Sequence, residues 1–115
     1  MYEGDLASHE TFGDWAIPEV ERLRGVYHDL LQRAAQYFAR CHAVDRSIAV
    51  CELALRSDPL QEQFQIAMID YYGYLGRREE AVHQYEGYCR ILASEIGVPP
   101  PPSTVRALER ALQAS

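Results

Sequence analysis

Lysine is absent from the sequence, tryptophan occurs once, and only three cysteines occur in 115 residues. All 11 basic residues are therefore arginines, and 17 acidic residues outnumber them, which gives a net charge of −6 at pH 7. Nucleic-acid-binding domains usually cluster an excess of basic residues on one face, because phosphate contacts release condensed counterions. The composition therefore argues against direct nucleic-acid binding by this chain.

The acidic excess lies at one end of the sequence. Residues 1–21 contain six acidic residues and no arginine, whereas acidic residues and arginines are equal in number beyond residue 21. In residues 1–13, Tyr2, Leu6 and Phe12 are irregularly spaced and show neither helical nor strand periodicity. We therefore expect an acidic N-terminal arm at 1–13 and a domain at 14–115.

Long apolar runs and secretory features are also missing. No segment approaches the ~18 apolar residues that a membrane span needs, and no signal peptide opens the chain. An odd number of cysteines without a secretory context indicates free thiols. We expect a cytoplasmic protein in which Cys41, Cys51 and Cys89 lie in apolar helical patterns as small buried residues.

Residues that catalysis or metal binding would need do not fall at useful spacings. The histidines and cysteines form neither a CxxC nor an HExxH motif, and Cys41-His42 has no second pair of ligands. Glu79 and Glu80 are adjacent, and such neighbours do not share a helix face. We expect no catalytic residue, no metal and no cofactor, and therefore a protein that is not an enzyme.

Apolar residues recur at intervals of three and four along most of the chain, which predicts amphipathic helices and no strands. The first helix is expected to begin between Asp14 and Pro18, because proline is tolerated in the first turn of a helix. Its apolar stripe continues to Cys41. Further helices are expected at about 44–57, 59–75 and 77–96, with a short fifth helix after residue 102.

Local signals mark the expected helix ends. Asp58 is suited to cap a helix that begins at Pro59, and Gln61 completes the spacing of a capping box. Gly76 occupies the place of a left-handed C-terminal cap. The run Pro99–Pro102 cannot be helix interior and is expected to be extended as polyproline II.

The sequence also matches itself at an offset of 34 residues. The corresponding pairs are Ala35 and Ile69, Phe38 and Tyr72, Ser47 and Ala81, and Cys51 and Tyr85. A 34-residue period with small and aromatic residues at these offsets is typical of tetratricopeptide repeats. The predicted fold is all-α and tetratricopeptide-like, with two antiparallel helical hairpins and a closing C-terminal helix.

Four blocks of the sequence resemble the bacterial transcriptional activator domain. They are Asp14-Trp15-Ala16-Ile17-Pro18-Glu19-Val20-Glu21-Arg22-Leu23, Asp58-Pro59-Leu60-Gln61-Glu62, the segment from Tyr72 through Leu75-Gly76-Arg77-Arg78-Glu79-Glu80-Ala81 to Gln84-Tyr85, and Leu92-Ala93 with Glu95-Ile96-Gly97-Val98, the prolines that follow and Arg106-Ala107-Leu108. The similarity covers about residues 2–113. The proline run is richer in proline than is usual in this family.

The resemblance implies a module of a larger bacterial transcription regulator. In that family a winged-helix DNA-binding domain usually precedes this domain. Residues 2–6 resemble the loop after the family's first helix, so the chain is expected to be a fragment that lacks this helix and the DNA-binding domain. The implied partners are other domains of the same regulator and the RNA polymerase machinery, and a second copy of the chain is a further expected partner. Nucleic acid is expected to bind only through the missing domain, and no membrane is expected to be a partner.

A protein-binding groove is expected on the concave side of the repeat array. Most tyrosines follow the apolar stripes, but Tyr74 does not, and it lies at an offset that faces this groove. The candidate groove residues are Asp29, Gln32, Gln36, Arg40, Gln63, Ile66, Asp70 and Tyr74. Two interpretations stay open, because the groove could bind a peptide or be filled by the chain's own arm or last helix.

Trp15 is the second candidate site residue. It would serve either as a packing anchor between the arm and the helices or as an interface anchor, since tryptophan is enriched at binding hot spots. If an upstream helix is missing, apolar surface near Trp15, Leu23 and Tyr27 is left bare, and self-association is expected.

Three functions compete at this stage. The first is a protein-interaction module of a transcription regulator, and the second is a tetratricopeptide-like scaffold unrelated to transcription. The third is direct nucleic-acid binding through Arg77, Arg78 and Arg90, which Glu79, Glu80 and Glu86 on the same helix oppose.

Overall fold

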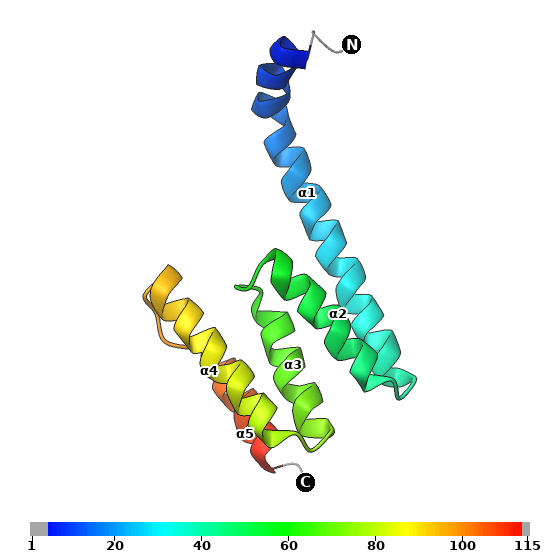
Figure 1. Ribbon diagram of the computed structural model, residues 1–115, viewed down its shortest axis with the longest axis vertical. Helices are drawn as coiled ribbons and strands as arrows, with labels where there is room; N and C mark the ends of the chain where they lie inside the picture. The colour runs from blue at the N-terminus through cyan, green and yellow to red at the C-terminus, as the bar shows by residue number, and fades with distance from the viewer. Residues whose placement is uncertain (1–4, 114–115) are drawn as a thin grey trace. The chain divides into compact units, whose positions relative to one another are not determined.

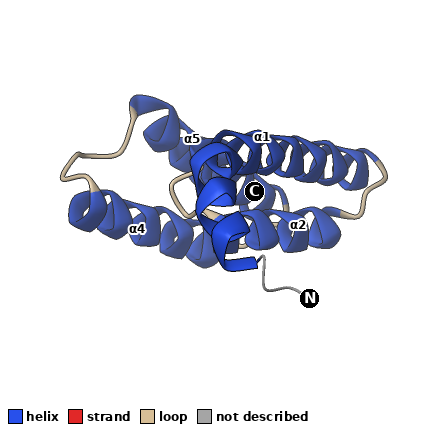
Figure 2. Ribbon diagram, turned by 90° about the horizontal axis from the view of Figure 1, so that it is seen from above, coloured by secondary structure: helices blue, strands red, loops and turns tan. Residues whose placement is uncertain are grey.

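The computed structural model describes residues 5–113, with side chains described from Pro18 onward. Five α-helices follow one another, and no strand occurs within residues 5–113 (Figures 1 and 2). They are α1 (Asp5–Arg40), α2 (Val44–Ser57), α3 (Glu62–Tyr74), α4 (Arg78–Glu95) and α5 (Pro102–Gln113). The predicted all-α fold of two hairpins and a closing helix is confirmed.

The chain divides by its internal contacts into two compact units, residues 1–30 and residues 31–115. The first unit consists mainly of the larger part of α1. The second unit contains the last turns of α1 and the helices α2 to α5, and it holds the hydrophobic core.

Helix α1 begins at Asp5, and Pro18 lies inside it. The expectation that the first helix starts between Asp14 and Pro18 is therefore wrong. The absence of an apolar stripe in residues 1–13 does not argue against a helix there. Leu6, Ala7 and Glu10 all have good helix propensity. A proline inside a helix costs about 3 kcal/mol, because it removes one backbone hydrogen bond, and the helix continues through this defect. The division into an arm at 1–13 and a domain at 14–115 stays a prediction.

The 34-residue repeat is visible in the backbone of the second unit. His42 and Gly76, which are 34 residues apart, both have left-handed backbone conformations, with φ of 62° and 76°. At each turn, the amide of the next residue donates a 2.8 Å hydrogen bond to the carbonyl of an aromatic residue, Phe38 in the first hairpin and Tyr72 in the second. The predicted helix end at Gly76 is confirmed. The equivalent turn uses a histidine in a conformation that glycine adopts at lower cost.

Small residues let the helices of each hairpin approach closely, as the repeat predicts. Ser47 and Ala81, at equivalent positions, are completely buried. The Ser47 hydroxyl donates a 2.6 Å hydrogen bond to the backbone carbonyl of Ala35, which ties α2 to the last turns of α1. The Arg46 guanidinium lies 5.8 Å from the centre of the Phe38 ring and covers that aromatic residue from outside.

The core of the second unit combines aliphatic, aromatic and very small side chains. Phe64, Met68 and Ile69 of α3 are at its centre, and each is 2% exposed or less. Gln65 is equally buried and is fully engaged: its amide donates to the Pro59 carbonyl at 2.9 Å and accepts from the Gln84 amide at 2.6 Å. This buried polar side chain joins the turn before α3 to both α3 and α4.

The start of α3 differs from the expectation. The helix begins at Glu62 rather than at Pro59, and Asp58 does not cap it. The Asp58 carboxylate instead accepts hydrogen bonds from the Leu60 amide at 3.1 Å and from the Gln61 side chain at 2.9 Å. An aspartate that bonds the amide two residues ahead forms a local turn, which competes with helix at this position.

Helix α5 begins one residue earlier than the proline run suggests. Residues 97–101 are not helical, but Pro102 is the first residue of α5, so the expectation of an extended Pro102 is wrong. The first helical position leaves its amide without an intrahelical partner in any case, and the fixed φ of proline suits it. Thr104, Ala107 and Ala111 form the buried face of the helix.

Candidate protein-binding surface

Helix α5 packs on the side of α3 that carries predicted groove positions. The Ser103 hydroxyl, at the start of α5, donates to the carboxylate of Glu62 at the start of α3. Near the other end, the Arg110 guanidinium donates to the Asp70 carboxylate at 3.1 Å and 3.3 Å. The early residues of one helix meet the early residues of the other, so the two helices run in the same direction.

The contact between α3 and α5 depends on Gly73. A Cβ atom at this position would lie 2.6 Å from the Cα of Ala111 and 2.7 Å from its Cβ. Both distances are well below a van der Waals contact, and one of the atoms belongs to the backbone of α5. Glycine at 73 and alanine at 111 therefore let the two helices touch directly, and a larger residue at 73 would push α5 away.

The predicted groove residues on α3 divide into open and occupied positions. Gln63 and Tyr74 are exposed, and at 68% Tyr74 is the most exposed of the large hydrophobic residues from Pro18 to Gln113. Ile66 is half-buried and packs against the core. Asp70 is held by Arg110 of α5. A side chain of the last helix therefore pairs with the groove position Asp70, whereas Gln63 and Tyr74 are exposed, and both interpretations of the groove stay predictions.

The remaining groove candidates lie on α1. In the second unit, Gln36 and Arg40 are exposed and Gln32 is half-buried. Asp29 belongs to the first unit and is exposed there. Binding of a protein partner to any of the eight candidate residues stays a prediction.

The second candidate site residue, Trp15, lies within the helical backbone of α1, but its side chain is outside the described side chains. Its role as an interface anchor stays a prediction. The three cysteines differ in burial: Cys51 is buried, Cys89 is half-buried and Cys41 is exposed. The expectation that all three are buried is wrong for Cys41, because α1 ends at Arg40 and Cys41 falls in the turn.

Burial changes the acid–base properties of several groups in the second unit. Desolvation, with the neighbouring charge of Glu52 as a smaller cause, raises the pKa of the Cys51 thiol to about 12. Burial also raises the pKa of Tyr71, Tyr72 and Tyr88 above the ordinary value of 10.0. All these shifts favour the neutral form, so burial keeps these groups uncharged to a higher pH than in water.

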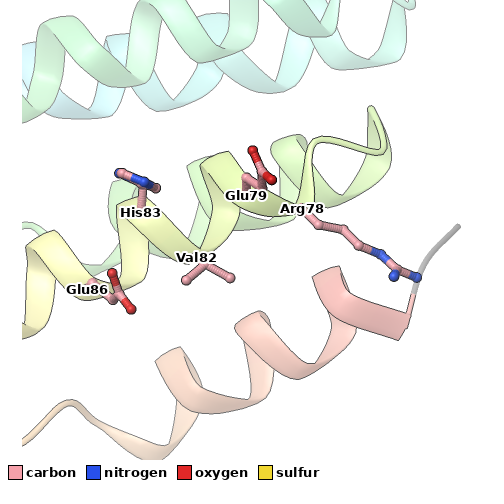
Figure 3. A pocket seen from close by; sticks show the side chains of 5 residues that line it. All are labelled: Arg78, Glu79, Val82, His83 and Glu86. Atoms are coloured by element: carbon pink, nitrogen blue, oxygen red, sulfur yellow. The ribbon is translucent and has the colours of Figure 1, made fainter.

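The exposed side of α4 has a shallow hollow of about 290 Å³. It is lined by Arg78, Glu79, Val82, His83 and Glu86 (Figure 3). All these residues come from one helix, and in Figure 3 Arg78, Val82 and Glu86 point to the side of α5 while Glu79 and His83 point away from it. The mixed charges and open form suit a solvated surface better than a ligand pocket.

The arginines considered for nucleic-acid binding lie among carboxylates. Arg77 approaches Glu80 at 3.6 Å and Asp45 of α2 at 3.9 Å. Arg78 shares the α4 hollow with two glutamates. A phosphate that approached these arginines would meet the carboxylates as well, which weakens the case for direct nucleic-acid binding.

Within the described residues, no three His, Cys, Asp or Glu side chains are grouped so that they could hold a metal ion, and no helix is long and apolar enough to cross a membrane. No curated protein and no solved structure matches the chain. The family described as the bacterial transcriptional activator domain matches it over residues 1–113. This match spans nearly the whole sequence and agrees with the two tetratricopeptide-like hairpins and the closing helix. The chain therefore belongs to the bacterial transcriptional activator domain family.

Proposed function

We propose that the chain is the protein-interaction module of a cytoplasmic bacterial transcription regulator, in which it follows a winged-helix DNA-binding domain. Family membership over residues 1–113 is the observation that carries this proposal. The module itself is not an enzyme, and it acts by binding other domains of the regulator or the RNA polymerase machinery. DNA recognition is assigned to the preceding domain.

The α3 side of the second unit supports binding of a protein partner. Tyr74 exposes an aromatic ring at the end of α3, and Gln63 is exposed at the start of the same helix. Between them, Ile66 offers a half-buried apolar surface, and the Asp70 carboxylate forms an ion pair with Arg110. An exposed tyrosine beside apolar and polar groups is the composition that binding hot spots favour.

The proposal is tested by measuring the binding of purified RNA polymerase to the full regulator and to the regulator with this module deleted. The binding of RNA polymerase is measured in the absence of DNA. Deletion of the module is expected to abolish this binding. Equal binding by both proteins would contradict the assignment of polymerase contacts to this module.

A point variant sharpens the test of the groove. Tyr74→Ala is expected to weaken partner binding at least fivefold, since loss of a hot-spot side chain costs more than about 1 kcal/mol. Tyr37→Ala is the matched control, because Tyr37 is also a tyrosine on a helix and is 56% exposed, but it is not among the groove positions. Equal losses in both variants would remove the groove from the proposal.

A further inference from the structure

Helix α5 packs on α3 and, less extensively, on α4, and its buried side chains are small. They are Thr104, Ala107 and Ala111. Burial stabilises in proportion to the apolar area removed from water, so these side chains hold α5 less firmly than Phe64 and Met68 hold α3. Within residues 18–113, the buried Thr104 hydroxyl also has no hydrogen-bond partner, which costs free energy. Helix α5 can therefore leave its neighbours at a lower cost than α3.

The connection between α4 and α5 contains a hinge. Helix α4 ends where the Gly97 amide donates a 2.7 Å hydrogen bond to the Leu92 carbonyl, and Gly97 has a φ of 80°. The next four residues, 98–101, each precede a proline, which disfavours the helical conformation and favours an extended one. An extended segment of four residues spans about 12 Å. The chain therefore turns back near Gly97, and the proline segment is a stiff arm that joins α5 to this hinge (Figure 1).

The face of α3 that α5 covers fits one particular helix. Glu62 accepts a hydrogen bond from Ser103, and eight residues further along α3 the Asp70 carboxylate pairs with Arg110. The absence of a side chain at Gly73 lets the backbone of α5 approach directly. A helix of another protein would have to supply a hydroxyl, a guanidinium and a small residue at the same spacing. The α5 of a second copy supplies all three.

We propose that α5 exchanges between two copies of this chain, so that the α5 of each copy lies on the α3 of the other. Exchange of an identical element between copies is a low-cost route to a dimer. Every contact between α3 and α5 is kept, and the hinge at Gly97 adopts a different backbone conformation, which glycine does more readily than other residues. Because the contacts are the same in both forms, a higher protein concentration favours the dimer by mass action.

The first experiment reverses the ion pair between α3 and α5 in two separate variants. Asp70→Arg brings two arginines together and Arg110→Asp brings two aspartates together, whether α5 stays in its own copy or exchanges with an identical one. In an exchanged dimer with one chain of each kind, both contacts between α3 and α5 again join opposite charges. The two variants are unfolded in urea together, refolded and examined by sedimentation equilibrium. The mixture is expected to dimerise with a Kd at least tenfold lower than that of either variant alone.

Two controls accompany this mixture. The chain that carries both substitutions is expected to match the unchanged chain, whose average mass is expected to rise from 13.1 kDa towards twice that value as the concentration increases. A mixture of Arg77→Glu and Glu80→Arg is expected to show no gain over its components, because this pair lies within one segment and cannot be exchanged. Circular-dichroism spectra verify that all variants remain helical.

Two outcomes of the first experiment would overturn the proposal. A mixture of Asp70→Arg and Arg110→Asp that dimerises no better than its components would show that α5 stays in its own copy. A mass of 13.1 kDa for the unchanged chain at every concentration would show that the exchanged dimer does not form.

The second experiment shortens the connection between α4 and α5. Deletion of Pro99 and Pro100 leaves too few residues for α5 to turn back onto its own α3, whereas an α5 that extends to a second copy does not need this turn. The shortened chain is expected to have twice the mass of one copy over the whole concentration range, with the circular-dichroism spectrum of the unchanged chain. A shortened chain that stays monomeric over this range would contradict the exchange. Neither experiment depends on the proposed role in transcription.

Discussion

In residues 31–115, apolar side chains that recur at helical spacing are buried against neighbouring helices, as Ile48, Cys51, Met68 and Leu92 show. In residues 1–30, a stripe with the same spacing is exposed, and among the side chains described there only His28 is buried. The two regions have equally clear periodicity in sequence. Helical periodicity therefore reports an amphipathic helix, but it does not report whether the apolar face is covered within the same chain.

The largest expected difference between the regions concerns the free energy of unfolding. Phe64→Ala is expected to lower it by about 3–5 kcal/mol, because this ring is 1% exposed and its removal leaves a cavity in the core. Leu23→Ala, at a position that is 52% exposed, is expected to change it by no more than about 0.5 kcal/mol in the monomer. Urea denaturation, at a protein concentration low enough for the chain to be a monomer, measures the free energy of unfolding of both variants. Similar losses would mean that residues 1–30 and 31–115 are packed alike.

A second comparison uses two glycines that lie inside helices of the two regions. Gly73→Ala is expected to destabilise the chain by about 1–3 kcal/mol, because the new Cβ would overlap the backbone of Ala111. Gly25→Ala has open space around the added Cβ and is expected to stabilise α1 by up to about 1 kcal/mol through helix propensity. Thermal unfolding followed by circular dichroism distinguishes the two signs. A stabilising Gly73→Ala would refute the close contact between α3 and α5.

The smallest effect is the response of the core to alkaline pH. The pKa of Cys51 rises from its ordinary 9.0 to about 12 in the folded state, so between these values the unfolded thiol loses its proton while the folded one keeps it. The unfolded state then binds fewer protons, and the free energy of unfolding falls as pH rises, by at most about 1.4 kcal/mol per pH unit from this group. The stabilising contribution is complete below pH 9 and is lost towards pH 12.

Cys51→Ala is expected to reduce this slope in urea denaturation experiments at pH 8, 9 and 10. It will not remove the slope entirely, since burial raises the pKa of Tyr72 and Tyr88 in the same direction. Thiol labelling at pH 8 provides an independent measurement, with rapid modification of the exposed Cys41 and protection of Cys51 until the chain unfolds. Equal labelling rates for the two thiols would contradict the burial of Cys51.

The fold could be predicted largely because its signals are local and repeated. The bounds expected for the second helix, 44–57, agree with α2, and the glycines at 76 and 97 end α3 and α4 with positive φ angles. The start of α3 was missed because the Asp58 carboxylate has two possible partners. From sequence alone, it could accept a hydrogen bond from the first amides of a helix or from the amide of Leu60, and it accepts the second. The start of α1 was missed because residues 1–13 show no helical periodicity in sequence.

The candidate site was predicted less completely, because its accessibility depends on contacts between segments far apart in the chain. The offset of Tyr74 from the apolar stripe predicted its exposure correctly. The pairing of Asp70 with Arg110, 40 residues away, has no signal in sequence, since surface charges have many possible partners. Gly73 was not singled out, although one signal was present: a glycine within a helix is costly and often marks a close approach by another segment.

By itself, the sequence determined the helix-forming periodicity, the 34-residue repeat, the left-handed turn at Gly76 and the family of the chain. These features follow from local backbone preferences and from the spacing of apolar residues, both of which operate over a few turns of helix. Only the tertiary structure decided that α5 lies directly on Gly73, that Asp70 is occupied and that Cys41 is exposed. The physical reason is that these features depend on which surfaces meet after the helices have formed, and several amphipathic helices of similar length could meet in more than one way.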